Sequence, residues 1–285
     1  MISTYSSFAV AGTGGLGSFI IKALASTPGI SVVVLSRSAS VVVPANATLR
    51  IVDYSSPLSL TTALAGSQVV ISTLNREGIA CQYPLADAAR VVGVQLFVPS
   101  DFGSPTENVI DGPLFPKEEV ATYLEKIGLS SLRVFTGAFS DQLFYPFAGF
   151  DFPNGKARWV GEGDTPISFT SRTDVAKFLA YTLTTLAPAK ISGKIFRLQG
   201  DTKSLNQVVQ IYEKTHQGKK VDVTRISVED AKHTIENDKT TLSFMYWLLL
   251  QWESGCSVEK SGPLSHNLYP VWNPVTVQNI LATYD

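Results

Sequence analysis

Charged residues are scarce in this sequence of 285 residues. They make up 16% of the chain, and the formal net charge is −1 at pH 7. A protein that binds nucleic-acid phosphates needs a surplus of Lys and Arg on one face, so this balance removes the electrostatic argument for nucleic acid as a main partner. The three histidines (His216, His233 and His266) show none of the close spacings that metal sites use. We therefore expect neither a nucleic-acid partner nor a bound metal.

Cysteines and long apolar runs are also scarce. The two cysteines, Cys81 and Cys256, lie far apart, which argues against a disulfide scaffold and favours the reducing cytosol. The first ten residues have no basic flank before their apolar stretch, unlike a signal peptide. The longest apolar run, 244–250, is too short to span a bilayer. We expect a cytoplasmic protein with no membrane segment.

The first half of the chain alternates strand and helix patterns. Near-continuous apolar runs predict strands at 7–12, 31–37, 49–54, 68–74, 95–102 and 131–139. Helical patterns occupy 16–27, 57–66, 83–93 and 116–128. Apolar runs without alternation are typical of parallel strands covered on both faces. The repeated β-α-β order predicts an α/β fold with a doubly wound parallel sheet, a Rossmann fold.

Beyond Phe139 this regular alternation of strand and helix patterns ends. The next segment is rich in aromatics, Pro and Gly; a helix is predicted at 174–186, a strand at 194–200, and mostly helix with loops from about Asp201. The apolar fraction of 45% is enough for a large core and suits a nucleotide domain plus a smaller one. We predict a nucleotide-binding domain at 1–145, to which 166–200 return. The other residues, 146–165 and 201–285, are predicted to form a smaller, mainly C-terminal substrate-binding region.

A glycine-rich turn follows the first predicted strand and opens the first helix. Its residues are Gly12, Thr13, Gly14, Gly15, Leu16 and Gly17, in the pattern G-x-G-x-x-G. In a dinucleotide site the first glycine permits the tight turn, the second lets the backbone approach the pyrophosphate, and the third lets the helix pack on the sheet. Free N–H groups at the helix start then face the phosphates. The alternative is a glycine-rich turn with no ligand.

The end of the second predicted strand indicates which nucleotide is preferred. An NAD site usually has Asp or Glu there, whereas this chain has Ser36, Arg37 and Ser38 with no carboxylate nearby. A guanidinium pairs with a 2′-phosphate through two parallel bonds, and a carboxylate repels it. The sequence therefore favours NADPH, unless Arg37 is a solvated loop residue.

Five blocks of sequence together resemble a known family. AGTGGLG (11–17), LSRS (35–38), VVISTL (69–74), FVPSDFG (97–103) and a helix opening with Lys117 come in the order seen in the NmrA-like, isoflavone-reductase-like group of atypical short-chain dehydrogenases. The resemblance covers about the first 140 residues, with a weaker echo at 161–180. The chain departs from the usual GGTGxxG by having Ala11 first. The resemblance implies an NADPH-dependent reductase.

The resemblance also implies a catalytic role for Lys117, because the plant reductases of this group use a lysine there as proton donor or orienting group. Pro116 suits the first helical position, which places Lys117 in the first turn. The helix dipole and partial burial both lower the pKa of such a lysine toward neutrality. The alternative is a surface lysine on an amphipathic helix. No Tyr-x-x-x-Lys occurs, since Tyr123 and Lys126 have the wrong spacing, so an ordinary short-chain dehydrogenase mechanism is disfavoured.

Other candidates lie near the predicted carboxyl edge of the sheet, where ligands bind in such folds. We expect Thr73, Leu74, Ser100 and Phe102 at the cofactor, and Phe102, Phe139 and Trp247 at the substrate. The phenylalanines are equally compatible with core positions. Core packing or a subunit interface also explains the aromatic run Phe244, Tyr246, Trp247 and Trp252. Asp174 is interpreted as the start of a helix.

Three hypotheses about function follow. The leading one is an NADPH-dependent reductase of secondary metabolism that transfers hydride to a conjugated or aromatic small molecule, with Lys117 supplying or steering the proton. The second is an NAD(P)-sensing regulator that binds a transcription factor, as some NmrA-like proteins do. The third is a cyclase or isomerase that uses the scaffold without redox chemistry. The chain is expected to be a monomer or homodimer.

Overall fold

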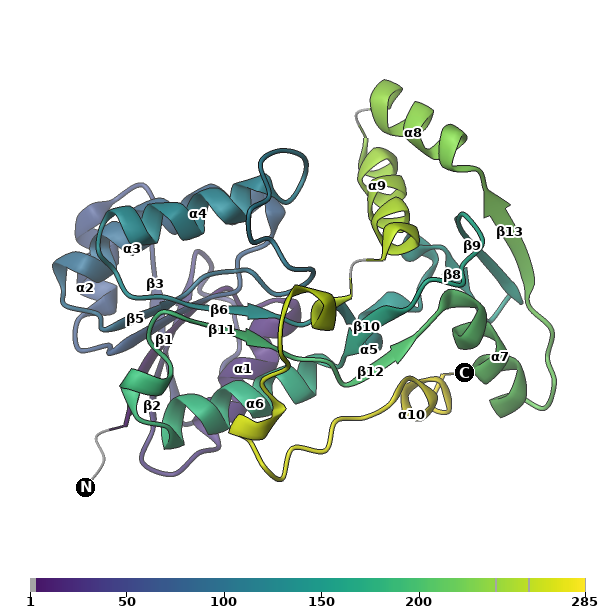
Figure 1. Cartoon of the computed structure of the whole chain (residues 1–285). Helices are drawn as coiled ribbons and strands as arrows, with labels where there is room; N and C mark the ends of the chain where they lie inside the picture. The colour runs from purple at the N-terminus through teal and green to yellow at the C-terminus, as the bar shows by residue number, and fades with distance from the viewer. Residues whose placement is uncertain (1–3, 239, 256, 285) are drawn as a thin grey trace.

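The computed structural model describes residues 4–238, 240–255 and 257–284. These residues form two parts that lie side by side (Figure 1). In the larger part, helices cover both faces of one sheet. The smaller part combines two three-stranded sheets with several helices.

A parallel sheet forms the centre of the larger part, with strand order β3-β2-β1-β4-β5. Its strands are β1 (Ser7–Ala11), β2 (Ser31–Ser36), β3 (Ala47–Ile51), β4 (Val69–Ser72) and β5 (Leu96–Val98). A parallel bridge from Phe97 to Ser131 brings β6 (Leu132–Phe135) beside β5, and β6 pairs in parallel with β11 (Lys194–Arg197). The strand order reverses between β1 and β4. The predicted doubly wound α/β fold is therefore confirmed.

Successive residues of the central strand face opposite cores. The helices of the larger part are α1 (Gly15–Ala25), α2 (Pro57–Leu64), α3 (Gln82–Val91), α4 (Phe115–Lys126) and α6 (Arg172–Thr185). Phe8 and Val10 pack with residues of α1 and α6, whereas Ala9 and Ala11 pack with residues of α2, α3 and α4 (Figure 1). Because both faces are covered, the strands read as continuous apolar runs.

The smaller part is built on two short sheets of order β12-β10-β7 and β13-β9-β8. The strands are β7 (Ala138–Phe139), β8 (Phe150–Asp151), β9 (Lys156–Val160), β10 (Ile167–Thr170), β12 (Asp201–Lys203) and β13 (Asp222–Ile226). The helices are α5 (Ser140–Leu143), α7 (Leu205–Thr215), α8 (Val228–Asn237), α9 (Thr241–Ser254) and α10 (Val277–Leu281).

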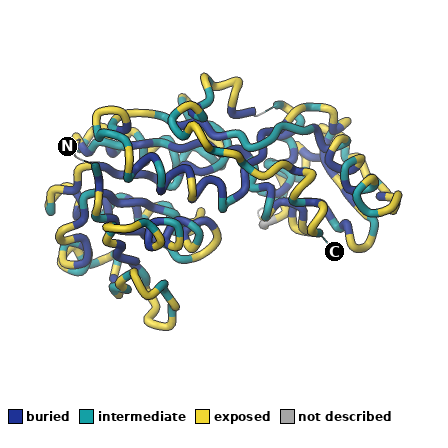
Figure 2. Tube along the Cα trace, turned by 90° about the horizontal axis from the view of Figure 1, so that it is seen from below, coloured by how far each residue is buried: buried dark blue, intermediate teal, exposed yellow. Residues whose placement is uncertain are grey.

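Aromatic side chains form the core of the smaller part. Phe144, Phe150, Phe152, Trp159 and Tyr212 are all almost completely buried. The ring of Phe152 stacks on that of Tyr212, with the two centroids 4.3 Å apart. Buried residues run through both parts of the chain (Figure 2), so each part has a core of its own. The aromatic-rich segment beyond Phe139 is thus mainly structural.

The single strand predicted at 131–139 is wrong, because the structure divides it. β6 ends at Phe135, and β7 belongs to a sheet of the smaller part. Gly137 between them has φ +65°, a conformation that favours glycine, and a Cβ there would overlap the carbonyl oxygen of Ser168. The chain therefore turns from one sheet into the other at Gly137.

Other strand boundaries also differ from the predictions. β3 ends at Ile51 and β5 at Val98, so both strands end earlier than predicted. Pro99 follows β5 and has no N–H to donate to a neighbouring strand, which explains the early end. β12 and β13 lie in the segment predicted to be mostly helical. β13 is half exposed, so it has no buried apolar run to reveal it.

The C-terminal segment returns to the larger part. Leu268, Tyr269 and Trp272 pack against the core that contains α1 and α6, and the ring of Tyr269 stacks on Tyr181 of α6 at 3.9 Å between centroids. The predicted division into domains stays a prediction. Among the described helices, none combines the length and apolar character that crossing a bilayer requires.

We expect Phe152→Ala to lower the free energy of unfolding by about 3–5 kcal/mol, because it leaves a cavity among buried aromatics. Phe147→Ala is the control, since its ring is 57% exposed, and we expect a change on the order of 0.5 kcal/mol. Urea unfolding measures both. Equal losses from the two variants would contradict the placement of this core.

Candidate cofactor and active site

The glycine turn makes a close approach to the end of β4. Gly12 has φ +101°, and a Cβ on it would lie 2.7 Å from Thr73 Oγ1. A Cβ on Gly17 would overlap the carbonyl oxygen of Gly12 and lie 2.5 Å from Thr73 Oγ1. The Thr73 hydroxyl lies 3.1 Å from the carbonyl oxygens of both Ala11 and Gly12, so one proton serves the two acceptors. These contacts leave no room for a side chain at positions 12 and 17, so packing requires glycine there whether or not a ligand binds.

Gly14 and Gly15 differ from those two glycines, because they face open space. No described atom lies within 4 Å of a Cβ placed on either residue. Gly14 is the N-cap of α1; among the described residues no side chain caps this helix, and its first turn holds no acidic residue. The unpaired N–H groups at a helix start attract anions. Open space over an uncapped helix start fits a dinucleotide pyrophosphate, and Thr13, half-buried, lies in the same turn.

A cavity of about 820 Å³ lies beyond the carboxyl ends of β4 and β5 and extends to the smaller part. It is lined by six of the residues predicted to bind the cofactor: Leu16, Thr73, Leu74, Ser100, Phe102 and Lys117. Phe139 and Trp247, predicted at the substrate, line the same cavity. The Ser100 hydroxyl donates to the Leu74 carbonyl at 2.8 Å, which joins the ends of the two strands. The structure thus brings these eight residues together.

Lys117 projects into this cavity from the first turn of α4. Its Nζ donates to the carbonyl oxygen of Phe102 at 3.2 Å, and a Cβ on Gly103 would lie 3.8 Å from the same atom. Burial lowers the pKa of the Lys117 amine; the Asp101 carboxylate opposes this shift and the Arg133 guanidinium adds to it. α4 begins at Phe115, so Pro116 is its second residue and not the first as predicted. Lys117 is therefore a half-buried amine, not a freely solvated one.

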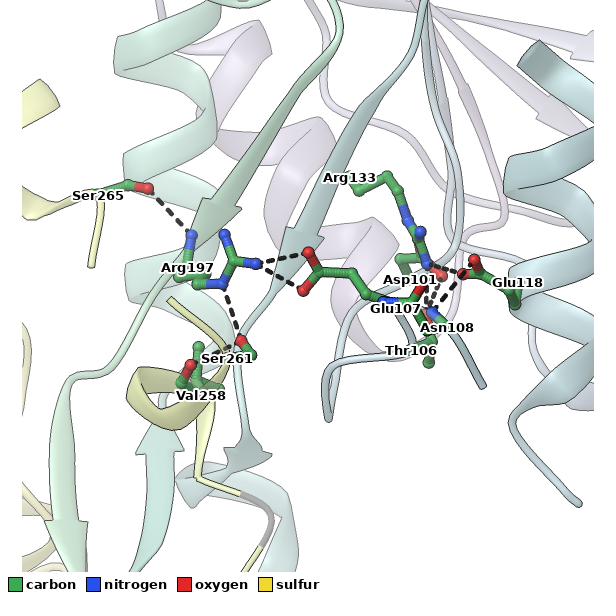
Figure 3. Close-up of polar contacts among 10 residues, drawn as sticks. All are labelled: Asp101, Thr106, Glu107, Asn108, Glu118, Arg133, Arg197, Val258, Ser261 and Ser265. Atoms are coloured by element: carbon green, nitrogen blue, oxygen red, sulfur yellow. Dashed lines mark hydrogen bonds and ion pairs between the residues drawn. The ribbon is translucent and has the colours of Figure 1, made fainter. Parts of the chain in front are cut away.

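A largely buried ion-pair network surrounds Arg133, beside the two chain segments that carry Phe102 and Lys117 (Figure 3). Arg133 Nε donates to Asp101 Oδ2 at 2.5 Å, and Arg133 Nη2 donates to Thr106 Oγ1 at 2.5 Å. Nη2 also lies 2.8 Å from Glu118 Oε2, in the geometry of an ion pair and not of a hydrogen bond. These residues were not predicted. An arginine within the apolar strand L-R-V-F was the available signal, because a charge there needs a partner.

Aromatic side chains of α9 form one wall of this cavity. Phe244, Trp247 and Trp252 line the cavity, and the rings of Phe244 and Trp247 stack with centroids 5.9 Å apart. The guanidinium of Arg76, which was not predicted, lies 4.5 Å from the centroid of Phe244. Tyr246 instead packs against the core of the smaller part. The aromatic run therefore serves both the cavity and the core.

Arg37 lies at a second, shallow hollow of about 570 Å³, with Asp53, Tyr54 and Cys81. The sequence has no carboxylate close to Arg37, but the fold brings one near. Asp53, 16 positions later in the chain, lines the same hollow, so the expectation of no nearby carboxylate is wrong. Ser55 donates to Asp53 through its backbone N–H and its hydroxyl, and these bonds lower the pKa of Asp53. Ser36 ends β2, and Ser38 follows Arg37 at the surface. The position of Asp53 after β3 was the missed signal.

Several other candidates lie away from the cavity. Tyr123 donates its hydroxyl to Asp87 of α3 at 2.5 Å and does not line the cavity. Asp174 is the third residue of α6, two positions after the helix start, and accepts hydrogen bonds from Ser171, the N-cap, and from Val275. No cluster of metal-binding side chains occurs in the described ranges. Cys81 has a free thiol, and Cys256 lies outside the described residues.

The sequence matches known proteins over most of its length. A profile of the NmrA-like family matches residues 8–281. The oxidoreductase AprR of Aspergillus flavus is 34% identical over 211 residues, which cover 70% of each chain. Phenylcoumaran benzylic ether reductase 1 of Arabidopsis thaliana is 25% identical, with 96% of this chain and 97% of the relative covered.

Solved structures share the fold at lower identity. The structure of AtPrR2 with NADP⁺ and (+)-pinoresinol superposes with a TM-score of 0.83 at 20% identity, over 100% of both chains. The leucoanthocyanidin reductase–NADPH complex from Vitis vinifera superposes with a TM-score of 0.80 at 19% identity, covering 97% of this chain and 98% of that one.

The two kinds of glycine in the turn predict opposite results for alanine substitution. Gly17→Ala forces a methyl group into the backbone of Gly12, and we expect a loss of about 1–3 kcal/mol in the free energy of unfolding. Gly14→Ala adds its methyl to open space at φ −81°, so the stability of the ligand-free protein stays unchanged. Thermal unfolding of both variants without nucleotide measures this difference. A destabilised Gly14→Ala protein would contradict the open space.

Proposed function

The chain belongs to the NmrA-like family, and on that premise we propose that it is an NADPH-dependent reductase acting on a conjugated or aromatic small molecule. The observation that carries the proposal is the shared cavity: a half-buried lysine, an aromatic wall and the ends of β4 and β5 border one space beside the glycine turn. The relative AprR is named an oxidoreductase, and two structures of the same fold are described with NADP⁺ or NADPH.

The residues of the glycine turn and of β4 would hold the cofactor. Gly14 and Gly15 leave room for the pyrophosphate at the uncapped start of α1. When bound, NADPH supplies the hydride. Thr73 and Leu74 place the end of β4 along the cavity, and the Thr73 hydroxyl holds it against the glycine turn. The protein would orient the cofactor and the substrate and supply the charges that stabilise the reaction.

Arg37 would recognise the 2′-phosphate that distinguishes NADPH from NADH. A guanidinium binds a phosphate through paired, charge-assisted bonds. Asp53 faces the same hollow, and because its hydrogen bonds from Ser55 lower its pKa, it is charged at neutral pH and repels the phosphate. The preference for NADPH then depends on the attraction of Arg37 exceeding the repulsion of Asp53.

Lys117 would handle the proton of the reaction. Addition of hydride to a conjugated carbonyl compound leaves negative charge on the carbonyl oxygen. The Lys117 ammonium stabilises that oxygen and donates a proton to it, and the lowered pKa of the amine brings its acidity closer to the operating pH. The rings of Phe139 and Trp247 suit a flat apolar substrate, since they present aromatic surface to the cavity. These two rings support the proposed substrate class.

We expect calorimetric titration to show tighter binding of NADPH than of NADH. Arg37→Gln lowers the affinity for NADPH at least about tenfold and leaves NADH almost unaffected, because the variant removes a charged hydrogen-bond donor. Asp53→Asn has the opposite effect and raises the affinity for NADPH, because it removes the charge that repels the 2′-phosphate. Gly14→Ala weakens both nucleotides. An Arg37→Gln protein that binds NADPH as tightly as the parent protein does would contradict the role of Arg37.

A second prediction separates binding from chemistry. Lys117→Met retains the parent affinity for NADPH but lowers NADPH oxidation with a panel of enones and quinones about 100-fold or more. Lys126→Met, at the exposed far end of the same helix, is the matched control and keeps the parent rate. Measurement is by absorbance of NADPH. Product formation without NADPH consumption would sink the reductase proposal in favour of a non-redox reaction.

A further inference from the structure

Two buried arginines on neighbouring strands hold the chain that leads from β5 to α4 (Figure 3). Arg133 lies on β6 and Arg197 on β11, which pair in parallel. Arg133 binds Asp101 and Thr106, whereas Arg197 binds Glu107 through its Nη2 at 2.5 and 2.7 Å. The segment 101–107 is thus fixed from both strands. The two arginines bind different residues of this segment, so substitution of each one tests a different set of contacts.

Arg133 contacts the two residues that flank the Lys117–Phe102 bond. Asp101 directly precedes Phe102, whose carbonyl oxygen accepts the bond from Lys117 Nζ, and Glu118 directly follows Lys117. One guanidinium binds both carboxylates, Asp101 at 2.5 Å and Glu118 at 2.8 Å. The side chain of Asp101 is 1% exposed and that of Arg133 is 12% exposed, so little water screens these charges.

We propose that Arg133 is a positioning residue for Lys117: by binding Asp101 and Glu118 together, it fixes the two chain segments between which the Lys117 amine makes its bond. The catalytic importance of this arrangement rests on the function proposed above. Arg133 itself does not line the cavity. It acts through its neighbours and not on the substrate.

The charges around Lys117 give this arrangement an electrostatic consequence. Asp101 beyond β5 favours the ammonium form, and Arg133 on β6 disfavours it. Glu118 on α4 partly neutralises Arg133, and Arg76, from the segment after β4, lines the same cavity. Removal of Arg133 takes away a positive charge and frees the buried carboxylate of Asp101. Both changes favour the protonated amine and raise the pKa of Lys117.

Arg197 provides the matched control. Like Arg133, it is largely buried and pairs with a carboxylate of the segment between β5 and α4, here Glu107. Its guanidinium lies 5.9 Å from the ring of Phe135, against 5.3 Å for Arg133. The other partner of its side chain is Ser261, whose hydroxyl accepts from Nε at 2.8 Å. Neither partner is adjacent to Phe102 or Lys117. A general loss of buried charge affects both arginines, whereas loss of positioning affects Arg133 alone.

The experiment measures the titration of the Lys117 amine directly and needs no substrate. The full chain is labelled with trace acetic anhydride across a range of pH, and peptide mass spectrometry reports the reactivity of each lysine. Lys126 in the same helix is the internal reference. The variants are Arg133→Met, Arg197→Met and Asp101→Asn, and circular dichroism verifies that each is folded. Asp101→Asn keeps the shape of the side chain and serves if Arg133→Met does not fold.

We expect the titration midpoint of Lys117 to rise by about one pH unit or more in Arg133→Met, to fall in Asp101→Asn, and to stay unchanged in Arg197→Met. A Lys117 midpoint that is unmoved in folded Arg133→Met or Asp101→Asn, or that moves equally in Arg197→Met, overturns the proposal. If the midpoint moves as expected while NADPH oxidation is absent from the parent, the coupling of Arg133 to Lys117 stands and the proposed reductase function fails.

Discussion

A parallel sheet with both faces covered leaves a ligand one place to bind, the edge beyond the carboxyl ends of its strands. In this protein the constraint acts strongly, because neighbouring residues of β1 enter two different cores. The glycine turn, Thr73, Ser100 and the loop before Lys117 all meet at that edge. The site follows from burial: the strands have no free face for functional side chains, so these gather where the strands end.

The turn at Gly137 leads the chain from this edge into the smaller part, and residues of both parts line the cavity. β6 pairs with β11 beside the five-stranded sheet, and after two further residues the chain enters β7, a strand of the smaller part. Phe139 and the aromatic residues of α9 line the same cavity as Lys117. Gly137, in a left-handed conformation, thus connects the larger part, which has the glycine turn, with the smaller part, which supplies the aromatic wall of the cavity.

The sequence predicted what depends on local pattern. The apolar runs revealed the parallel strands, the position of the glycine turn indicated its place in the fold, and the resemblance to a family singled out Lys117. Residues whose partners are distant in sequence were missed. Asp53 reaches the hollow of Arg37 only because β3 lies beside β2, and Arg133 meets Glu118 only after α4 packs on the sheet. The division of the predicted strand at Gly137 was missed because Ser168, which excludes a side chain there, lies 31 positions away.

The position of α6 and β11 in the chain has a consequence for how the protein folds during synthesis. α6 covers the same face of the sheet as α1, but it follows β7–β10 of the smaller part in the chain. Trp272, near the end of the chain, packs against Phe178 of α6. A nascent chain that has left the ribosome only as far as β6 therefore has α1 but not yet α6 on that face, so part of the apolar surface there is still exposed. Such uncovered apolar surface favours aggregation and chaperone binding. The larger part, although it begins at the N-terminus, completes its core only when translation has nearly ended.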